Sequence, residues 1–199
     1  MGPGPEPAAP WSPPGDEDGA AFAWGVQTGD ALPTAVMVSV RTLETSVSLT
    51  LVKGVADGWE EVTSGEVFVP VDGVVQLELS ELNADTTYAI AFFAADTTRR
   101  SRVARFRTAL TTGASRLLRF GATSCLGNAN DPWPCMSFST AEKLDFFLLL
   151  GDTIYADANP NQFDYVEKFK TALSLSGLQD TCAGTSIVAT WDDHEIDNN

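Results

Sequence analysis

The chain has 199 residues, of which 44% are hydrophobic and 20% charged, a composition typical of globular proteins with one large or two small domains. Its net charge of −15 excludes broad nucleic-acid binding, because an acidic surface repels phosphate backbones. A local metal-filled pocket remains compatible with that charge. No stretch approaches the roughly 20 apolar residues that span a bilayer, and the first five residues lack the features of a secretory signal.

Residues 1–19 are predicted to form an extended, disordered leader. They hold six of the eleven prolines, four glycines and the acidic run Asp16-Glu17-Asp18. Such a composition offers little apolar surface to bury and favours extended backbone.

Residues 20–110 predict an antiparallel β-sandwich. Short segments with period-two alternation are separated by turn residues, and none has helical spacing. The segment Leu79–Tyr88 resembles the tyrosine-corner region of fibronectin type III-like domains, in which a tyrosine near the start of a strand bonds to an upstream loop. The expected strands cover residues 35–40, 46–51, 66–69, 75–79, 87–92 and 102–107.

A small polar linker, residues 111–115, precedes a different pattern in residues 116–199. The run Phe146–Leu150 is continuously apolar, as expected of a strand buried on both faces. Alternating strands and helices indicate a parallel sheet with right-handed crossovers. We expect strands at 117–122, 146–150 and 186–191, with helices at 139–144 and 163–175.

Chemically active residues follow each of these three strands. Cys125 follows the first, Asp152 the second, and the pair Asp193–His194 the third. Ligands of open α/β sheets bind beyond the carboxyl ends of the strands, so these side chains are predicted to converge. Carboxylates gathered without a cation would repel one another, which favours a metal site.

The loop after the second strand suggests which metals. Asp152 can bridge two cations, and Tyr155 can fold back onto the same site. Phenolate together with thiolate favours ferric iron, while oxygen ligands such as Asp193 suit a second, harder cation. Two such cations would polarise a phosphoryl group and activate water, and His194 could protonate the leaving oxygen.

Three ordered motifs resemble those of the PhoD-like phosphatases, the alkaline phosphatase D family of the metallophosphoesterase superfamily. They are Ser124-Cys125, Gly151–Asp157 and Thr190–Asn199, and Phe22–Asp30 is similar to the opening of that family's sandwich domain. The resemblance covers roughly residues 20–199. It implies an exported, periplasmic or extracellular enzyme that hydrolyses phosphate mono- and diesters with Fe³⁺ and Ca²⁺.

Carried over by residue, the resemblance implies roles for each candidate. Cys125 and Tyr155 would hold iron, Asp152 would bridge the metals, and Asp193 would hold the second cation. His194 would be the catalytic histidine. Asp192 is expected to support these ligands without touching a metal. The plainer alternatives are a buried Cys125, a packed Tyr155 and a solvated Asp193 and His194.

One departure from the family pattern affects the expected function. The family takes further ligands, histidines included, from later loops, whereas this sequence has a single histidine, His194. We therefore interpret the chain as the first part of the catalytic domain. Two alternatives stay open, a non-catalytic sandwich module with an inert α/β segment and a purple acid phosphatase-like centre. Cys135 and Cys182 could form a disulfide, and the expected partners are small phosphate esters.

Overall fold

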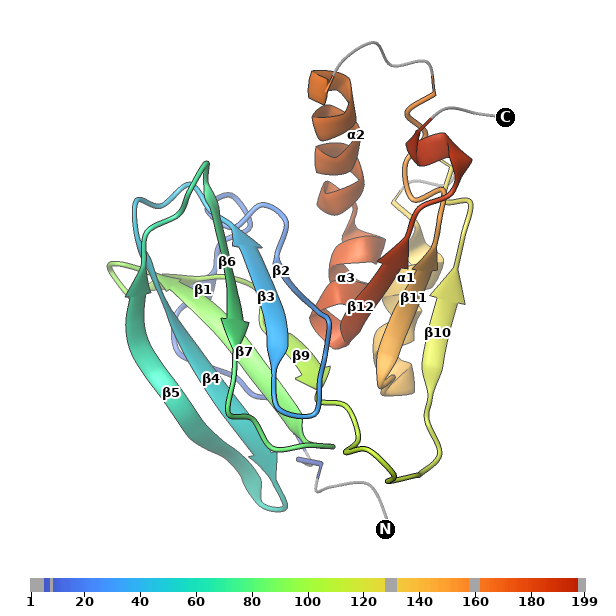
Figure 1. Cartoon of the computed structure of the whole chain (residues 1–199). Helices are drawn as coiled ribbons and strands as arrows, with labels where there is room; N and C mark the ends of the chain where they lie inside the picture. Colours follow the sequence, from blue (N-terminus) through green and yellow to red (C-terminus); the bar gives the residue numbers. More distant parts are fainter. Residues whose placement is uncertain (1–5, 8, 128–131, 158–161, 197–199) are drawn as a thin grey trace.

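The structure is a computed structural model that describes residues 6–7, 9–127, 132–157 and 162–196. Two sheets organise these residues (Figure 1). The first has the order β1-β8-β7-β4-β5, and β9 also pairs with β7. Its strands are β1 (Asp16–Glu17), β4 (Val47–Val55), β5 (Gly58–Phe68), β7 (Thr87–Ala94), β8 (Arg99–Arg100) and β9 (Ala104–Arg107).

The second sheet has the order β10-β11-β12-β2-β3-β6 and joins the two halves of the chain. Its first three strands are parallel to one another, and β2, β3 and β6 pair antiparallel. The strands are β2 (Val26–Gly29), β3 (Val36–Arg41), β6 (Val74–Leu79), β10 (Phe120–Thr123), β11 (Phe146–Leu150) and β12 (Ser186–Thr190). The predicted sandwich followed by a partial α/β region is confirmed.

The sandwich encloses the larger apolar core between β2-β3-β6 and the first sheet. Alternate residues of β3 and most of β4 are buried, as the period-two patterns predict. The same expectation is wrong for β7, which is buried along its whole length. The tyrosine corner is also confirmed, because the Asn83 backbone N–H donates to the Tyr88 hydroxyl at 2.8 Å. The Tyr88 ring stacks on Phe106 at 5.3 Å between centroids, which fixes β7 against β9.

The predicted disorder of the leader is wrong for the residues that the structure describes; residues 1–5 and 8 lie outside them. Pro7 packs against Gly54, where an added Cβ would lie 2.7 Å from the proline ring. The Trp59 indole donates to the Ala9 carbonyl at 2.9 Å, and Asp16–Glu17 pairs with β8. Proline restricts the unfolded backbone, so ordering this segment costs less entropy than its composition suggests.

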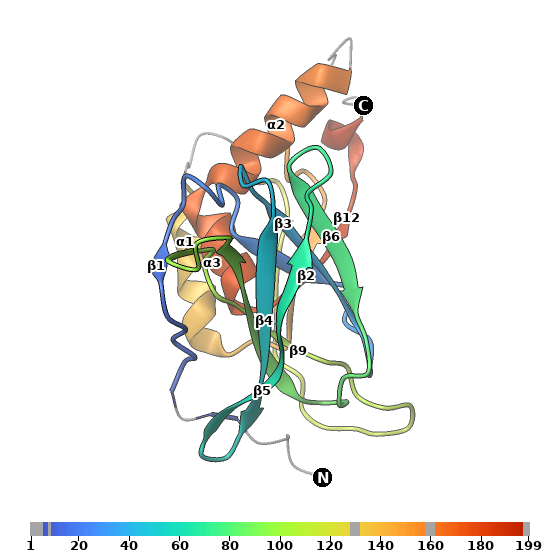
Figure 2. The same cartoon turned by 90° about the vertical axis from the view of Figure 1, so that its left-hand side faces the viewer.

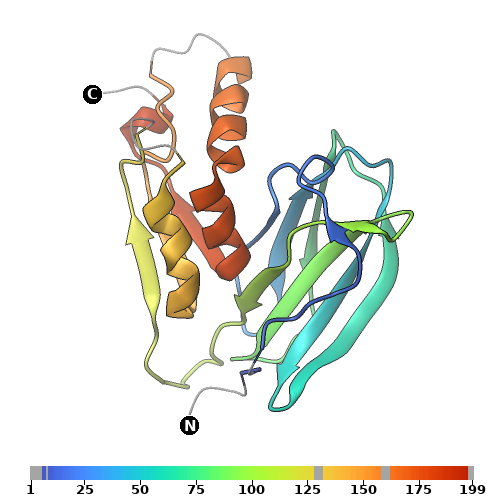
Figure 3. The ribbon, with the colours of Figure 1, turned by 180° about the vertical axis from the view of Figure 1, so that it is seen from behind.

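A second apolar core lies between the strands β10–β12 and the helices. Phe147 and Leu149 of β11 are buried in it, whereas Phe146, Leu148 and Leu150 lie on the opposite face. The helices cover only one face of these strands (Figures 1 and 3). They are α1 (Pro134–Ser137), the 3-10 helix η2 (Phe138–Glu142), α2 (Gln162–Ser174) and α3 (Ser176–Gly184).

The sequence pattern did not predict α3. Leu175 is extended and separates α2 from α3, which begins at Ser176. Gly177 lets α3 approach α1, because an added Cβ would lie 2.1 Å from the Trp133 carbonyl oxygen. Cys182 of α3 is a buried free thiol and Cys135 an exposed one, so the suggested disulfide between them is wrong.

The opposite face of β10–β12 is exposed among the described residues. Phe120, Leu150 and Val188 keep 57%, 47% and 50% of their surface accessible. Phe120 and Phe146 stack on this face with ring centroids 5.3 Å apart. The prediction that Phe146–Leu150 is buried on both faces is therefore wrong for this face, where the described residues leave Leu150 exposed.

The sandwich and the α/β region meet where β12 pairs with β2. Ile187 is paired with Gly29, at which an added Cβ would lie 3.0 Å from the Ile187 carbonyl oxygen. The hydroxyls of Thr28 and Ser186 lie 3.3 Å apart and are buried. Because one sheet runs through both regions, the boundaries at 110 and 116 stay a prediction. Figure 2 shows the molecule from the side on which the sandwich strands β4 and β5 lie in front of the helices α1 and α3. No described helix is long and apolar enough to cross a membrane.

Candidate metal centre

The loops that follow β10, β11 and β12 meet at the carboxyl ends of these strands, the upper end in Figure 1. The loop after β12 contains the short 3-10 helix η3 (Asp193–Glu195). The Leu126 backbone N–H donates to the Asp152 carbonyl at 2.9 Å, which ties the first loop to the second. The Ala156 N–H donates to the His194 carbonyl at 2.9 Å, which ties the second to the third.

Strained backbone at the ends of β10 and β11 directs these loops. Cys125 and Asp152 both adopt left-handed φ angles, of 56° and 53°, which are uncommon for residues with a Cβ. Gly151 has a φ of 93°, and an added Cβ there would lie 2.5 Å from the Cβ of Asp192. Such strain persists where surrounding bonds fix the conformation, and it is concentrated at functional sites.

Glu195 supplies those bonds. Its carboxylate is buried and accepts four backbone N–H groups. One oxygen accepts from Asp152 and Asp192, each at 2.9 Å. The other accepts from Thr153 and Ile154. A single buried anion therefore fixes the second loop against the third, as charge-assisted hydrogen bonds can do.

Asp152 lies at the centre of the predicted ligand cluster. The Cys125 thiol donates to its Oδ2 at 3.4 Å. Its Oδ1 is buried and has no hydrogen-bond partner among the described residues. A buried carboxylate oxygen without a partner is costly, and a bound cation would satisfy it.

Asp193 and His194 complete the cluster around Asp152. One ligand atom from each of these three residues lies within 4.8 Å of the others. Asp152 is buried, whereas Asp193 and His194 are half-buried. The cluster thus has one deep and two shallower candidate ligands, an arrangement that would let a bound metal contact solvent or substrate.

Tyr155 stacks at a tilt against His194, with ring centroids 4.2 Å apart. Burial, followed by the negative charges of Asp152 and Cys125, raises the pKa of the Tyr155 phenol above its ordinary value of 10.0. Without a cation this phenol is therefore protonated. A strongly acidic metal beside it would reverse the electrostatic effect and favour phenolate.

The imidazole of His194 is held by Asp157, whose Oδ1 lies 2.7 Å from Nδ1. That hydrogen bond, outweighing partial burial, raises the pKa of His194 above 6.5, and the charges of Asp157, Asp152 and Asp193 add to it. The contact also fixes the orientation of the imidazole ring, and Nε2 is the ring nitrogen that it does not engage.

Asp192 caps η3 and does not belong to the ligand cluster. It is the residue before the helix, and its side chain accepts the Glu195 backbone N–H in a capping box. The structure thus brings together Cys125, Asp152, Tyr155, Asp193 and His194, as the sequence predicts. Their roles as metal ligands and catalyst stay a prediction.

The sequence interpretation missed two residues of this site. Glu195 has no predicted role, although the spacing Asp192-x-x-Glu195 is a capping-box signal. Asp157 gave no signal of its contact with His194, which depends on how the loop after β11 folds. The donor set found here, carboxylates with a thiol, a phenol and an imidazole, suits transition metals and harder cations.

Comparison with known proteins adds an independent observation. Residues 120–199 match the model of the family described as PhoD-like phosphatase. A solved structure of PhoD aligns at a TM-score of 0.77 and 23% identity, over 96% of this chain and 41% of that chain. This similarity shows a shared fold, and the chain spans about two fifths of the PhoD length.

Similarity elsewhere is weaker. The fn3 domain of the human collagen alpha-1(XX) chain aligns with 54% of this chain at a TM-score of 0.36 and 17% identity, over 96% of that domain. The third fibronectin III domain of the human KIAA0343 protein covers 52% of this chain and 90% of that domain, at a TM-score of 0.34 and 13% identity. A search of curated proteins finds no significant match.

Proposed function

Because residues 120–199 belong to the PhoD-like phosphatase family, we propose that the protein hydrolyses phosphate mono- and diesters with the help of bound metal ions. Members of this family are generally metal-dependent. The observation that best supports the proposal is the buried, unpartnered Oδ1 of Asp152 beside Asp193 and His194. Because the chain covers 41% of the PhoD structure, the proposal concerns the whole enzyme.

The candidate ligands would divide between two cations. Cys125 and Tyr155 would hold Fe³⁺, Asp193 would hold Ca²⁺, and Asp152 would contact both through its two oxygens. Thiolate and phenolate suit the trivalent ion, and carboxylate suits calcium. When bound, the metals would withdraw charge from the phosphoryl group and lower the pKa of a water molecule.

The chain's own residues prepare this chemistry. Glu195 holds Asp152 and its loop in the strained conformation that presents the carboxylate. Asp157 fixes the ring of His194 through Nδ1, so Nε2 is available for a substrate oxygen. A protonated His194 would donate that proton to the leaving oxygen or stabilise negative charge in the transition state.

A second candidate function is non-catalytic, and the ordered β-sandwich with its tyrosine corner is the observation behind it. A β-sandwich followed by a partial catalytic region could act as a binding module without turnover. The two candidates differ in what the 199-residue chain does with a chromogenic phosphodiester. Turnover by this chain well above the background rate would contradict the inert alternative.

The enzymatic proposal is tested by comparing Asp152→Asn with Asp72→Asn in the whole enzyme loaded with Fe³⁺ and Ca²⁺. Asp72 is exposed and has a φ of 52°, close to the 53° of Asp152, so it controls for the backbone conformation. We expect Asp152→Asn to lower kcat/KM for bis-p-nitrophenyl phosphate at least about 100-fold, since loss of a residue that only supports a metal ligand already costs about 10- to 100-fold. Equal activity of the two variants would contradict the proposal.

Export from the cytoplasm is proposed from the family resemblance alone. Phosphate esters that cannot cross a membrane are the substrates that an exported phosphatase would reach. Fractionation of producing cells tests the location, and recovery of the native protein only in the cytoplasm would contradict it.

A further inference from the structure

A pocket lined by basic side chains lies near the amino ends of β10 and β11, the opposite end of the sheet from the ligand cluster. Strand β11 separates the two ends by about 13 Å at 3.3 Å per residue. The pocket has a volume of about 300 Å³, which is enough for a small ligand. Five of the twelve Lys and Arg residues of this acidic chain line it, namely Arg105, Arg107, Arg116, Arg119 and Lys143.

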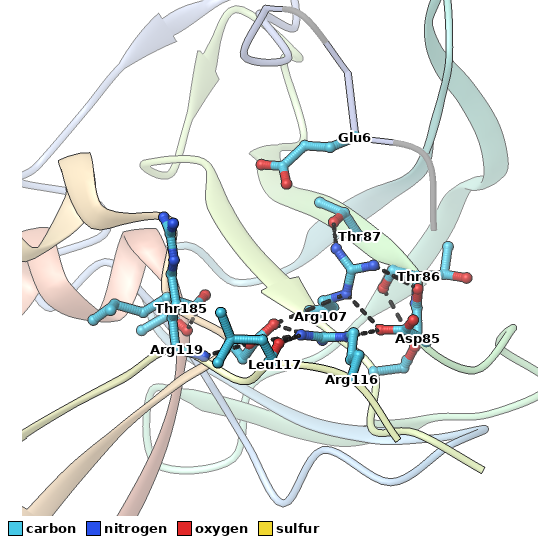
Figure 4. Close-up of polar contacts among 12 residues, drawn as sticks. Glu6, Asp85, Thr86, Thr87, Arg107, Arg116, Leu117, Arg119 and Thr185 are labelled. Atoms are coloured by element: carbon cyan, nitrogen blue, oxygen red, sulfur yellow. Dashed lines mark hydrogen bonds and ion pairs between the residues drawn. The ribbon is translucent and has the colours of Figure 1, made fainter. Parts of the chain in front are cut away.

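Two of the five cations form the rigid floor of this basic pocket. The Nε atoms of Arg107 and Arg116 both lie 2.8 Å from Asp85 Oδ1, and Arg116 also reaches Asp145 Oδ1 at 2.7 Å (Figure 4). Arg107 and Arg116 keep only 4% and 9% of their side-chain surface exposed. Because the charges of Arg107 and Arg116 are paired with carboxylates, these side chains shape the pocket and contribute less to attracting a ligand.

The other three cations are more accessible. Among the described residues, the Arg119 guanidinium has no hydrogen-bond or ion-pair partner, although its backbone N–H bonds to Asp145. Arg105 and Lys143 share one partner, the carboxylate of Glu6, at 2.8 Å and 3.9 Å. Glu6 belongs to the leader, so the anion that faces these cations comes from a separate segment of the chain.

We propose that this basic pocket binds a small phosphate-bearing anion, inorganic phosphate or an oligophosphate, and that the Glu6 carboxylate occupies part of the site in this structure. Five cations against the carboxylates of Glu6, Asp85 and Asp145 leave a local positive excess in a chain of net charge −15. Guanidinium groups recognise phosphate oxygens through paired N–H donors, and lysine adds a point charge.

The pocket volume limits the ligand to a small molecule. A nucleic-acid strand would need a continuous cationic surface, which the overall charge opposes. The site is separate from the ligand cluster, so anion binding does not depend on the proposed hydrolysis. Inorganic phosphate is a product of the proposed hydrolysis, so its binding here would make the pocket a product-binding site. An oligophosphate would be a ligand unrelated to that reaction.

Isothermal titration of the metal-free full chain tests the proposal with tripolyphosphate and inorganic phosphate as separate arms, at constant ionic strength. We expect saturable binding of at least one anion with a dissociation constant below about 1 mM, weakened by added salt. The anion with the lower dissociation constant is then identified as the ligand of the pocket. Absence of saturable binding in both arms would overturn the proposal.

Variants locate the binding. Lys143→Ala and Arg119→Ala alter exposed side chains, so they should fold normally while weakening binding about fivefold each. Glu6→Gln should strengthen it by a similar factor, because it removes the competing carboxylate. Lys53→Ala is the matched control, since Lys53 pairs with Glu60 on the sandwich and does not line the pocket. Equal losses in Lys143→Ala and Lys53→Ala would contradict binding at this pocket.

Asp152→Asn separates this proposal from the proposed function. Substitution in the ligand cluster should leave anion affinity unchanged in metal-free protein. Loss of the heat signal in Asp152→Asn would place the anion at the carboxyl end of the sheet and overturn the assignment.

Discussion

The two ends of the β10–β12 sheet carry opposite charge. At the carboxyl end, carboxylates, a thiol and a phenol surround an unpartnered oxygen of Asp152. At the amino end, arginines are bonded to Asp85 and Asp145 and line a basic pocket. The carboxyl end keeps unsatisfied groups and strained backbone, whereas ion pairs at the amino end bind the sandwich to the α/β region. The arrangement at the carboxyl end suits metal binding and catalysis, and that at the amino end suits stable packing of the sandwich against the α/β region.

Removal of the buried carboxylate of Glu195 should damage the carboxyl end most. Glu195→Ala leaves four backbone N–H groups without their acceptor. We expect a loss of about 3–5 kcal/mol in the free energy of unfolding, from buried charge-assisted bonds. Urea denaturation monitored by circular dichroism measures it. A loss below about 1 kcal/mol would show that the loops do not depend on this anion.

Arg116→Met should disrupt the amino end by a somewhat smaller amount. It removes the ion pairs to Asp85 and Asp145 and leaves both carboxylates poorly paired, at a cost of about 3 kcal/mol. Fluorescence-monitored urea unfolding measures the cost. Arg41→Met is the control, because Arg41 lies over the Trp24 ring on the sandwich surface. Equal losses in both variants would contradict a special role for Arg116.

The same ion pairs predict a pH dependence. Burial alone would raise the pKa values of Asp85 and Asp145, but hydrogen bonds and charges from Arg107 and Arg116 outweigh it and hold both below 3.8. Each carboxylate therefore stabilises the fold above pH 3.8, and the stabilisation is lost as the pH falls through the lower folded value. Arg116→Met should flatten the acid limb of a stability–pH profile. An unchanged limb would be contrary to this linkage.

Asp157→Asn should produce a smaller, local change at the carboxyl end. His194 is the only histidine, so its proton resonances can be followed without overlap. In metal-free protein its pKa should lie above 6.5 and fall toward that value in the variant, because the Asp157 hydrogen bond is lost. A raised pKa is linked to stability that is present below pH 6.5 and lost as the pH rises through the folded value. Identical titrations would contradict the contact.

Thiol labelling gives the smallest effect and compares metal-bound with metal-free protein. Cys125 and Cys135 are exposed, whereas burial raises the pKa of Cys182 to about 12. We expect two fast thiols and one slow one with a disulfide reagent. Added iron should protect Cys125 alone, and Cys135 serves as the internal control. Protection of both, or of neither, would be inconsistent with a metal at the carboxyl end.

Much of this arrangement could be predicted from local sequence patterns. The apolar run Phe146–Leu150 indicates a strand of a parallel sheet, although only one of its faces is covered. The rule that ligands gather at carboxyl ends predicts the meeting of Cys125, Asp152 and Asp193. The tyrosine corner at Tyr88 has a local signal too. These features depend on residues close in sequence or on general topology.

Other features depend on contacts between distant segments, which no local pattern reveals. Pro7 is ordered because it packs on Gly54, and the basic pocket combines β9, residues 116–119 and the segment before β11. The start of α3 depends on Gly177 meeting α1. Asp157 reaches His194 only after two loops fold together.

Ferric iron titrated into the metal-free chain tests the metal centre most directly, with visible absorbance as the readout. We predict a charge-transfer band that saturates and is abolished by Tyr155→Phe, while Tyr165→Phe retains it. Cys125→Ala should shift or weaken the same band. A colourless iron complex, or a band that survives both Tyr155→Phe and Cys125→Ala, would contradict a metal centre at the carboxyl ends of β10, β11 and β12.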